Sequence, residues 1–388
     1  MKTIIGRDPE SGRCLSVAVS DGVIESVDES SESTELFLSP GLVDLQVNGY
    51  AGFDINYPQL LPETVIGLVD VMLSLGVTCF APTIITASVD RICDALAAIA
   101  EARRVHPKAA ACIPFVHVEG PHISPLDGYR GAHPAEVVRP PSLVEFQQWQ
   151  KAAGGCVGMV TLSPHFAEAN VYIAELVAEG IHVAIGHTHA SAEQIERAVA
   201  AGACLSTHLG NGIAATVPRH ANPIWPQLAE DRLAATFISD GHHLPPAVIK
   251  AMLRAKGVAR SILVSDSVAL AGMPAGIYDT PVGGRVELRS DGRLCLLGTE
   301  LLAGATASLA ECVGNLVSIT DLPLHQVLKM ATENPGRFAG NRGQLKVGSR
   351  ADIVRFRWQD AMSIEDVWLG GERVYRRGGV EAHEENSG

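Results

Sequence analysis

A repeated alternation of two kinds of segment constrains the fold of this chain most strongly. Short apolar runs without polar alternation follow one another, and longer segments with apolar residues at helical spacing separate them. Such bare runs are typical of parallel strands that are buried on both faces. The predicted strands are 42–48, 77–84, 113–119, 157–163, 181–187, 203–208, 234–239 and 261–266.

The segments between these strands carry start and stop signals of α-helices. A serine precedes several of them at an N-cap position, and a glycine follows several others. The predicted helices are 62–75, 88–104, 142–153, 167–179, 191–201 and 245–256, with N-caps at Ser88, Ser142 and Ser191. Eight strand-then-helix units predict a (β/α)8 TIM-like barrel. A doubly wound sheet is the alternative, but it normally brings a glycine-rich phosphate loop, which this sequence lacks.

The two ends of the chain differ from its middle. Residues 15–27 predict a hairpin around Asp21-Gly22, and residues 343–377 alternate strand-like pieces with glycines. We therefore expect 1–40 and 341–388 to form one small β-sandwich and 41–340 to form the barrel. Within the barrel, 278–298 predicts a hairpin-like insert, and the tail after 380 predicts a frayed terminus.

Charge and cysteine content narrow the class of protein. Lys+Arg 30 against Asp+Glu 43 gives a net charge of −13, which disfavours nucleic-acid binding. The chain has no apolar run of about eighteen residues and no signal-peptide stretch at its start, so we expect no membrane span. Its 8 cysteines form no Cys-x-x-Cys pair, which favours free thiols in a reducing cytoplasm.

Carboxylates and imidazoles collect at the carboxyl ends of the predicted strands, where a (β/α)8 barrel builds its active site. Glu119, His187 and His208 end three different strands. One carboxylate and two imidazoles can bind a divalent metal and leave positions for water and substrate, as in catalytic sites. The alternative is a set of hydrogen-bonded histidines at the barrel mouth.

Two further residues are candidates for the chemistry. Asp266 ends the eighth strand and is the natural general base, unless it only caps the next segment. His133 follows the third strand, where it could stabilise an oxyanion or be an ordinary loop histidine. His189 and His242 stand beside stronger candidates, and we expect them to lie outside the site.

These motifs resemble the amidohydrolase superfamily and, within it, the N-acetylglucosamine-6-phosphate deacetylase family. The resemblance covers nearly the whole chain. Its anchors are 40–49 (PGLVDLQVNG), 117–121 (HVEGP), 131–134 (GAHP), 186–188 (GHT), 207–209 (THL), 240–243 (DGHH), 263–266 (LVSD), 331–335 (ATENP) and 343–354 (GQLKVGSRADIV).

The resemblance implies hydrolysis of N-acetylglucosamine 6-phosphate to glucosamine 6-phosphate and acetate. Glu119, His187 and His208 would hold the metal. Asp266 would act as base and then as acid, and His133 would polarise the acetyl carbonyl.

The resemblance also implies how the substrate is held. Asn211 and Gly212 would meet the sugar phosphate, and His243 would contact it as well. Arg219 would reach the phosphate bound in the neighbouring subunit of a homodimer.

The first strand narrows the metal count. It carries Gln46 and Asn48 where many amidohydrolases have His-x-His, and the fourth strand has no lysine. Amide side chains are poor ligands for borderline metals. We therefore expect one divalent metal ion per subunit, Zn2+ first, with Fe2+ or Mn2+ as alternatives.

Departures from the family leave other substrates open. His122 stands where an aromatic residue is usual, and Gly210 stands where a bulky one is more frequent, which would enlarge the sugar pocket. A different N-acyl hexosamine phosphate, such as N-acetylgalactosamine 6-phosphate, is one alternative. An N-acyl-amino-acid deacylase or cyclic-amide hydrolase is another, since arginine also binds carboxylates. A non-enzymatic sugar-binding barrel would require the loss of metal ligands or base, and all are present.

Overall fold

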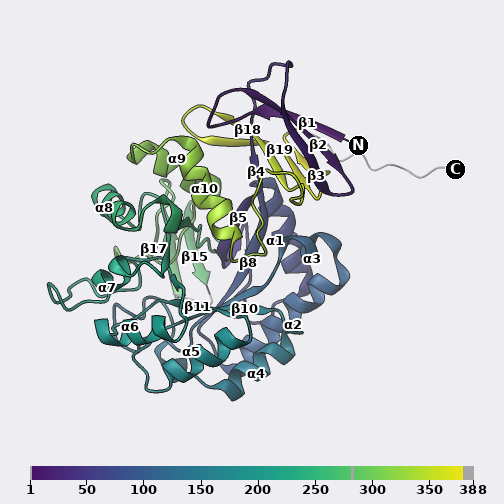
Figure 1. The fold of residues 1–388 in the computed structure, drawn as a ribbon. Helices are drawn as coiled ribbons and strands as arrows, with labels where there is room; N and C mark the ends of the chain where they lie inside the picture. Colours follow the sequence, from purple (N-terminus) through teal and green to yellow (C-terminus); the bar gives the residue numbers. More distant parts are fainter. Residues whose placement is uncertain (1, 281–283, 379–388) are drawn as a thin grey trace.

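The computed structural model describes residues 2–280 and 284–378 (Figure 1). A (β/α)8 barrel makes up most of it, and a separate sheet built from both ends of the chain packs beside the barrel. The predicted fold class is therefore confirmed. The predicted frayed tail lies outside the described residues.

Eight parallel strands form the barrel in chain order. They are β5 (Leu42–Val47), β8 (Val77–Ile85), β9 (Val116–Glu119), β10 (Val157–Leu162), β11 (His182–Ile185), β12 (Leu205–Ser206), β13 (Ala234–Phe237) and β14 (Ser261–Leu263). Each overlaps its predicted range. Most are shorter than predicted, because the polar residues at their carboxyl ends leave the ladder and enter loops at the mouth of the barrel.

The first and last strands close the barrel through specific contacts. The backbone N–H of Asp266 donates to the carbonyl of Gln46 (3.0 Å). The buried carboxyl of Asp44 accepts from the backbone N–H of Ser265 (3.2 Å). Burial raises the pKa of Asp44 to about 7, although these hydrogen bonds oppose the shift. The chain around Asp266 is therefore held directly against the first strand.

Helices cover the outside of the barrel (Figure 1). The predicted ones are α1 (Pro62–Ser74), α2 (Val89–Val105), α4 (Leu143–Ala152), α5 (Ala169–Ala178), α6 (Ala192–Ala200) and α8 (Pro246–Lys256). Ser88, Ser142 and Ser191 each accept a hydrogen bond from a first-turn N–H, so the three predicted N-caps are confirmed. Helices not predicted are α3 (Pro107–Cys112), α7 (Ile224–Ala229), α9 (Leu309–Ile319), α10 (Leu324–Ala331) and α11 (Glu333–Gly336).

An insert separates the eighth strand from its helices. It forms a three-stranded sheet of β15 (Gly276–Thr280), β16 (Gly284–Leu288) and β17 (Leu294–Leu296). The hairpin predicted here therefore has a third strand, and residues 281–283 are outside the described residues. Two short strands, β6 (Gly49–Tyr50) and β7 (Phe53–Asp54), pair beside the end of β5.

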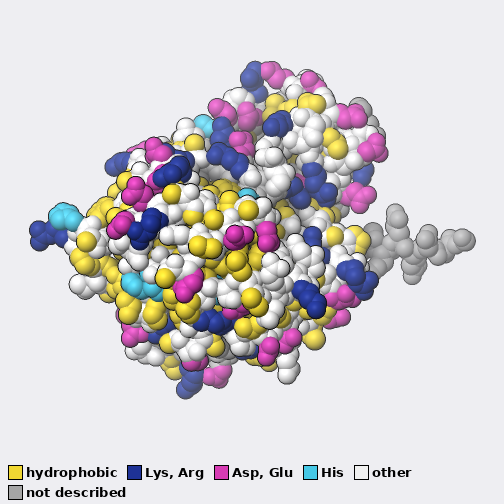
Figure 2. Space-filling model, turned by 60° about the horizontal axis from the view of Figure 1, so that its bottom comes forward, with side chains coloured by type: hydrophobic (Ala, Val, Ile, Leu, Met, Phe, Trp, Pro, Cys, Tyr) yellow, Lys and Arg dark blue, Asp and Glu magenta, His cyan; other side chains and the backbone are white. Residues whose placement is uncertain are grey.

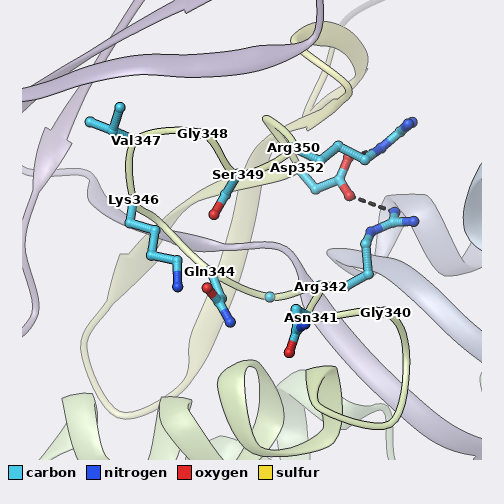
Figure 3. A pocket seen from close by; sticks show the side chains of 11 residues that line it. Gly340, Asn341, Arg342, Gln344, Lys346, Val347, Gly348, Ser349, Arg350 and Asp352 are labelled. Atoms are coloured by element: carbon cyan, nitrogen blue, oxygen red, sulfur yellow. Dashed lines mark hydrogen bonds and ion pairs between the residues drawn. The ribbon is translucent and has the colours of Figure 1, made fainter.

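The chain ends form a seven-stranded, mostly antiparallel sheet in the order β20-β19-β18-β4-β1-β2-β3. Its strands are β1 (Lys2–Arg7), β2 (Cys14–Ser20), β3 (Val23–Glu29), β4 (Phe37–Pro40), β18 (Ile353–Trp358), β19 (Met362–Leu369) and β20 (Glu372–Arg376). The predicted hairpin around Asp21-Gly22 joins β2 to β3. Arg342 donates to the carbonyls of Thr78 and Ala111 on the barrel and pairs with buried Asp352 (Figure 3). This contact ties the sheet to the amino end of the barrel.

Apolar side chains fill the lower interior of the barrel, which is therefore packed rather than open. They include Val43, Leu45, Phe115, Met159 and Ile262, and we call these five residues the floor. The cysteines are free, as predicted. Within the described part of the chain, every helix is too short or too polar to cross a lipid bilayer.

Candidate active site

The strand ends and the insert enclose a cavity of about 540 Å³. It is lined by polar residues from the barrel on one side and by apolar residues from and beside the insert on the other. The apolar side includes Val268, Leu270, Val286, Leu294, Leu301 and Leu302. The predicted site residues that line the cavity are Glu119, His133, His187, His208, Asn211, Gly212, His243 and Asp266. Arg219 is the only predicted site residue that does not line it.

Glu119, His187 and His208 meet at the base of this cavity. Oε1 of Glu119 lies 2.9 Å from Nε2 of His208 and 3.3 Å from Nε2 of His187. All three side chains are buried. Burial alone would raise the pKa of Glu119, but the hydrogen bonds and charges of the two imidazoles hold it well below its usual range.

The contacts around these three residues fit a divalent metal ion. Nδ1–H of His187 donates to the carbonyl of Tyr129 (2.9 Å), so the neutral ring would offer its Nε2 lone pair to a metal ion beside Glu119. Gln46 donates to the other carboxylate oxygen of Glu119 (3.1 Å) and orients it. Nδ1 of His208 has no partner among the described residues. Two imidazole nitrogens around one carboxylate oxygen form a donor set that zinc and similar ions accept.

The backbone is strained at three of the predicted site residues. His187, His208 and Asp266 have φ values of 45°, 27° and 49°. Non-glycine residues seldom adopt this left-handed region, and such strain gathers at functional sites. Each of these residues comes just after a barrel strand. The unusual turn directs its side chain into the cavity instead of continuing the strand.

Position 212 requires glycine because it lies against the His187 ring. Its φ is +61°, and a Cβ atom there would lie 2.7 Å from Nδ1 of His187. Only glycine lets the loop after β12 approach the imidazole this closely. The neighbouring Asn211 donates its amide to the carbonyl of His208 (3.3 Å), which holds the same loop.

Asp266 faces the three candidate ligands from the end of the eighth strand. Its Oδ1 accepts a hydrogen bond from Nδ2 of Asn48 (2.8 Å). Burial raises the pKa of Asp266 to about 6, against the opposing charge of His208. A carboxyl with a pKa near neutrality can both take up and return a proton.

His133 reaches the cavity from the loop after β9. Its Nδ1 lies 2.7 Å from Oγ1 of Thr86, and its ring centroid is 4.4 Å from that of His187. Burial, assisted by the charge of His187, lowers the pKa of His133 to about 3, so the imidazole is neutral. Among the described residues, the compact set of candidate ligands consists of Glu119, His133 and His187, whose ligand atoms lie within 4.8 Å of one another, so it contains His133 where the prediction has His208.

His243 is fixed at the cavity wall by a carboxylate. Its Nδ1 lies 2.7 Å from Oδ2 of Asp240. Burial opposes ionisation of Asp240, but the hydrogen bond and charge of His243 lower the pKa of Asp240 to about 2. His242 instead contacts the carbonyl of Asp291 and lies outside the cavity, as expected.

Arg219 is exposed on the loop before α7, which projects from the barrel (Figure 1). The side chain of Asn222 donates to the carbonyls of Pro218 and Arg219, and Nε1 of Trp225 donates to the Arg219 carbonyl (3.1 Å). These bonds fix the loop and leave the guanidinium in solvent. Figure 2 shows a projection bearing basic and histidine side chains at its left edge, while acidic and basic groups intermingle over the rest of that face.

The two departures from the family pattern, His122 and Gly210, do not alter the cavity as expected. His122 lies outside it, stacked on Trp149 (ring centroids 5.5 Å apart). Gly210 lines the cavity at φ +99°, but a Cβ atom there would meet Cδ2 of Leu244 at 2.9 Å. A side chain at 210 would therefore start toward the barrel–helix packing. This geometry does not support the expectation that Gly210 widens the sugar pocket.

Sequence reasoning missed two buried polar residues of the site. His117 lies two residues before Glu119 on β9 and so faces the same way. Its Nε2 contacts Oγ1 of Thr161 (2.7 Å), and burial lowers its pKa to about 4. Thr86 directly follows β8, which, like β5 and β10, is a strand for which no site residue was predicted. The signal that could have found both is a polar side chain at a strand end. His189 lies outside the cavity, as expected.

Known proteins provide a separate comparison. The amidohydrolase family model matches residues 37–374. N-acetylglucosamine-6-phosphate deacetylase of Bacillus subtilis (strain 168) is 30% identical, with 87% of each chain covered. N-acetylgalactosamine-6-phosphate deacetylase of Escherichia coli O157:H7 is 29% identical, covering 91% of this chain and 93% of that one. The crystal structure of N-acetyl-D-glucosamine-6-phosphate deacetylase from Mycobacterium smegmatis gives a TM-score of 0.84 at 27% identity, over 94% of this chain and 96% of the other.

Proposed function

The chain belongs to the amidohydrolase family, and from this premise we propose that it hydrolyses the acetamide of N-acetylglucosamine 6-phosphate to give glucosamine 6-phosphate and acetate. The observation that carries this proposal is the position of Asp266. A buried carboxyl with a pKa of about 6 shares one cavity with a carboxylate and two imidazoles that suit a metal. This combination is typical of hydrolytic sites.

The proposed metal ligands are Glu119, His187 and His208. They would hold one divalent ion, zinc in the first place and Fe2+ or Mn2+ as alternatives. When bound, the ion supplies Lewis-acid activation of water and of the acetyl carbonyl. Gln46 orients the Glu119 carboxylate for this purpose, and the Tyr129 carbonyl fixes the tautomer of His187.

Asp266 and His133 carry the proton and charge movements in this proposal. Asp266 takes a proton from the attacking water and later gives it to the departing amine nitrogen. Asn48 holds its Oδ1 in place through the 2.8 Å hydrogen bond. Neutral His133 donates from Nε2 to the carbonyl oxygen as that oxygen gains negative charge.

The phosphate requires a strongly basic partner such as arginine, which the described lining of the cavity does not supply. No lysine or arginine is among the described residues that line it, while Asp54, Asp279 and Glu300 do line it. Asn211, Gly212 and His243 would contact the sugar phosphate, and Arg219 of a second copy of the chain would neutralise it. We therefore propose a homodimer. A phosphorylated sugar and free cysteines also favour a cytoplasmic location.

A second candidate substrate is N-acetylgalactosamine 6-phosphate. The Escherichia coli relative, named for that sugar, is 29% identical to this chain, against 30% for the Bacillus subtilis relative. These identities are too close to choose between the two sugars. Since both reactions use the same acetamide, the same site chemistry serves either.

Acetate release by the zinc-loaded protein tests the proposal. The substrates are N-acetylglucosamine 6-phosphate, N-acetylgalactosamine 6-phosphate and unphosphorylated N-acetylglucosamine, with Asp266→Asn as control. Turnover of a phosphorylated sugar that is lost in the control supports the reaction. Equal turnover with and without phosphate would reject the proposed phosphate contacts. No turnover of any of the three by metal-loaded protein would reject the proposed substrate class.

A further inference from the structure

Thr86 places a buried hydroxyl beside the proposed oxyanion donor. It follows β8 directly and is 2% exposed. Its Oγ1 lies 2.7 Å from Nδ1 of His133 and 3.4 Å from the backbone carbonyl oxygen of Glu119. The next residue, Gly120, has no side chain to block this approach, since a Cβ atom there would lie 2.1 Å from Oγ1 of Thr86.

The position of one proton decides what His133 can do. A neutral imidazole carries a proton on only one of its nitrogens. If Nδ1 carries it, Nδ1 donates to Thr86 and Nε2 has only a lone pair. If Thr86 donates to Nδ1 instead, the proton sits on Nε2. That nitrogen has no partner among the described residues, and His133 lines the cavity.

The two hydrogen-bond contacts of the Thr86 hydroxyl differ in length. The 2.7 Å contact to Nδ1 is a good length for an O–H donor, whereas the 3.4 Å contact to the Glu119 carbonyl is too long to be strong. If His133 donated to Thr86, the threonine proton would have only the long contact in a buried place. An underused buried donor costs free energy, so donation from Thr86 to His133 is the better arrangement.

We propose that the Thr86 hydroxyl donates to Nδ1 of His133 and is a positioning residue that keeps the His133 proton on Nε2. This inference rests on the proposed function of the same site. A donor at Nε2 is what a carbonyl oxygen needs as it becomes an oxyanion. Thr86 acts only through His133 and need not touch the substrate.

A rival arrangement gives Thr86 the opposite role. His133 could be a metal ligand with Glu119 and His187, because their ligand atoms lie within 4.8 Å of one another. Nδ1–H would then donate to Thr86, as the second nitrogen of a metal-bound histidine usually does. The two arrangements differ in the tautomer of His133 and in what loss of the hydroxyl does to metal binding.

Three variants, two at Thr86 just after β8 and one at Thr78 within it, separate these roles. Thr86→Val removes the hydroxyl at nearly constant volume, and Thr86→Ser restores it. Thr78→Val is the matched control, because Thr78 is 1% exposed at the opposite end of β8. We expect Thr86→Val to lower kcat about 10- to 100-fold, with KM changed less than about 2-fold and metal content retained. We expect Thr86→Ser to regain most of kcat and Thr78→Val to match wild type.

Nitrogen-15 NMR of histidine-labelled protein reads the tautomer directly. The His133 signals are identified by their absence from His133→Gln. We expect wild type and Thr86→Ser to show the Nε2–H form and Thr86→Val to show a mixture. The wild-type spectrum answers the question even if Thr86→Val folds poorly.

Three results would overturn the proposal. One is an Nδ1–H form of His133 in wild type. Another is loss of metal from Thr86→Val while kcat per bound metal is kept, which would make His133 a ligand. The third is a Thr86→Val enzyme with unchanged kcat and unchanged tautomer. Failure of wild type to release acetate would reject the proposed function instead, and the spectra would still decide the role of Thr86.

Discussion

The floor and the mouth of the barrel use their buried volume in opposite ways. The floor consists of close-packed apolar side chains such as Leu45 and Met159, each 2% exposed. The mouth buries carboxylates and imidazoles just as deeply, with Glu119 at 2% and His208 at 3%. Burial of apolar atoms stabilises the fold, whereas burial of ionisable groups opposes it unless they are paired.

The floor and the mouth also differ in backbone conformation, which is regular in the floor and strained at the mouth. Four of the five floor residues lie on strands and Phe115 directly precedes β9, but His187, His208 and Asp266 at the mouth lie in the left-handed region. Such positions cost free energy that the rest of the fold must supply. We infer that the two ends of the barrel interior serve different purposes: the floor stabilises the fold, and the mouth carries the chemistry. Substitutions in the mouth should change activity more than stability, and substitutions in the floor should do the reverse.

Asp266→Asn should give the largest effect on activity and should separate activity from stability most clearly. The amide cannot accept or return a proton, so we expect kcat to fall about 10²- to 10⁴-fold. The free energy of unfolding should stay equal or rise, because the variant no longer buries a carboxyl whose pKa burial raises to about 6. Acetate release and urea unfolding at one metal loading measure both. A large loss of stability would contradict the division.

Asp44→Asn should remove a pH dependence of stability. Burial raises the pKa of Asp44 in the folded protein to about 7, against about 4 when unfolded. The folded state therefore binds more protons, and stability falls as pH rises from about 4 to about 7, by up to about 4 kcal/mol. We expect the Tm of wild type to fall over this interval more steeply than that of the variant. Parallel curves would show that the carboxyl does not titrate in this range.

Met159→Ala should destabilise the floor without touching the chemistry. Methionine-to-alanine changes in a packed core cost about 3 kcal/mol, and Met159 is 2% exposed. We expect this loss at every pH, with kcat of the folded enzyme within about 2-fold of wild type. Urea unfolding at two pH values, alongside Asp44→Asn, checks both statements. A selective loss of kcat would mean that the floor positions the mouth more tightly than we infer.

The same division explains what the sequence could predict. Period and apolar runs located all eight barrel strands. Polar residues at or after strand ends gave five of the predicted site residues that line the cavity, and the family resemblance gave the other three, which are Asn211, Gly212 and His243. Thr86 was missed because a threonine carries no distinctive metal or acid–base signature. The direction of a side chain at Gly210 was misjudged, because it follows from φ +99° in a turn. Helices α9 and α10 were missed because the insert displaces them along the chain from the eighth strand.

His122→Phe should have the smallest effect on stability and activity. It tests whether packing behind the cavity belongs to the active site. The His122 ring stacks on Trp149 and meets Tyr172 edge to face, and the phenyl ring can keep both contacts. The variant loses the hydrogen bond of Nδ1 to the Arg139 carbonyl (3.1 Å), but it also loses the buried Nε2 that has no partner. These changes oppose each other, so we expect stability within about 1 kcal/mol of wild type.

Substrate preference provides the stricter test of His122→Phe. Because His122 does not line the cavity, the ratio of kcat/KM between N-acetylglucosamine 6-phosphate and N-acetylgalactosamine 6-phosphate should change less than about 2-fold. Val144→Ala, on the exposed face of α4, is a control whose side chain is 71% exposed and outside the cavity. A clear change of preference in His122→Phe alone would mean that packing behind the site affects the bound sugar through the loop after β9. The functional region would then include the stack on Trp149.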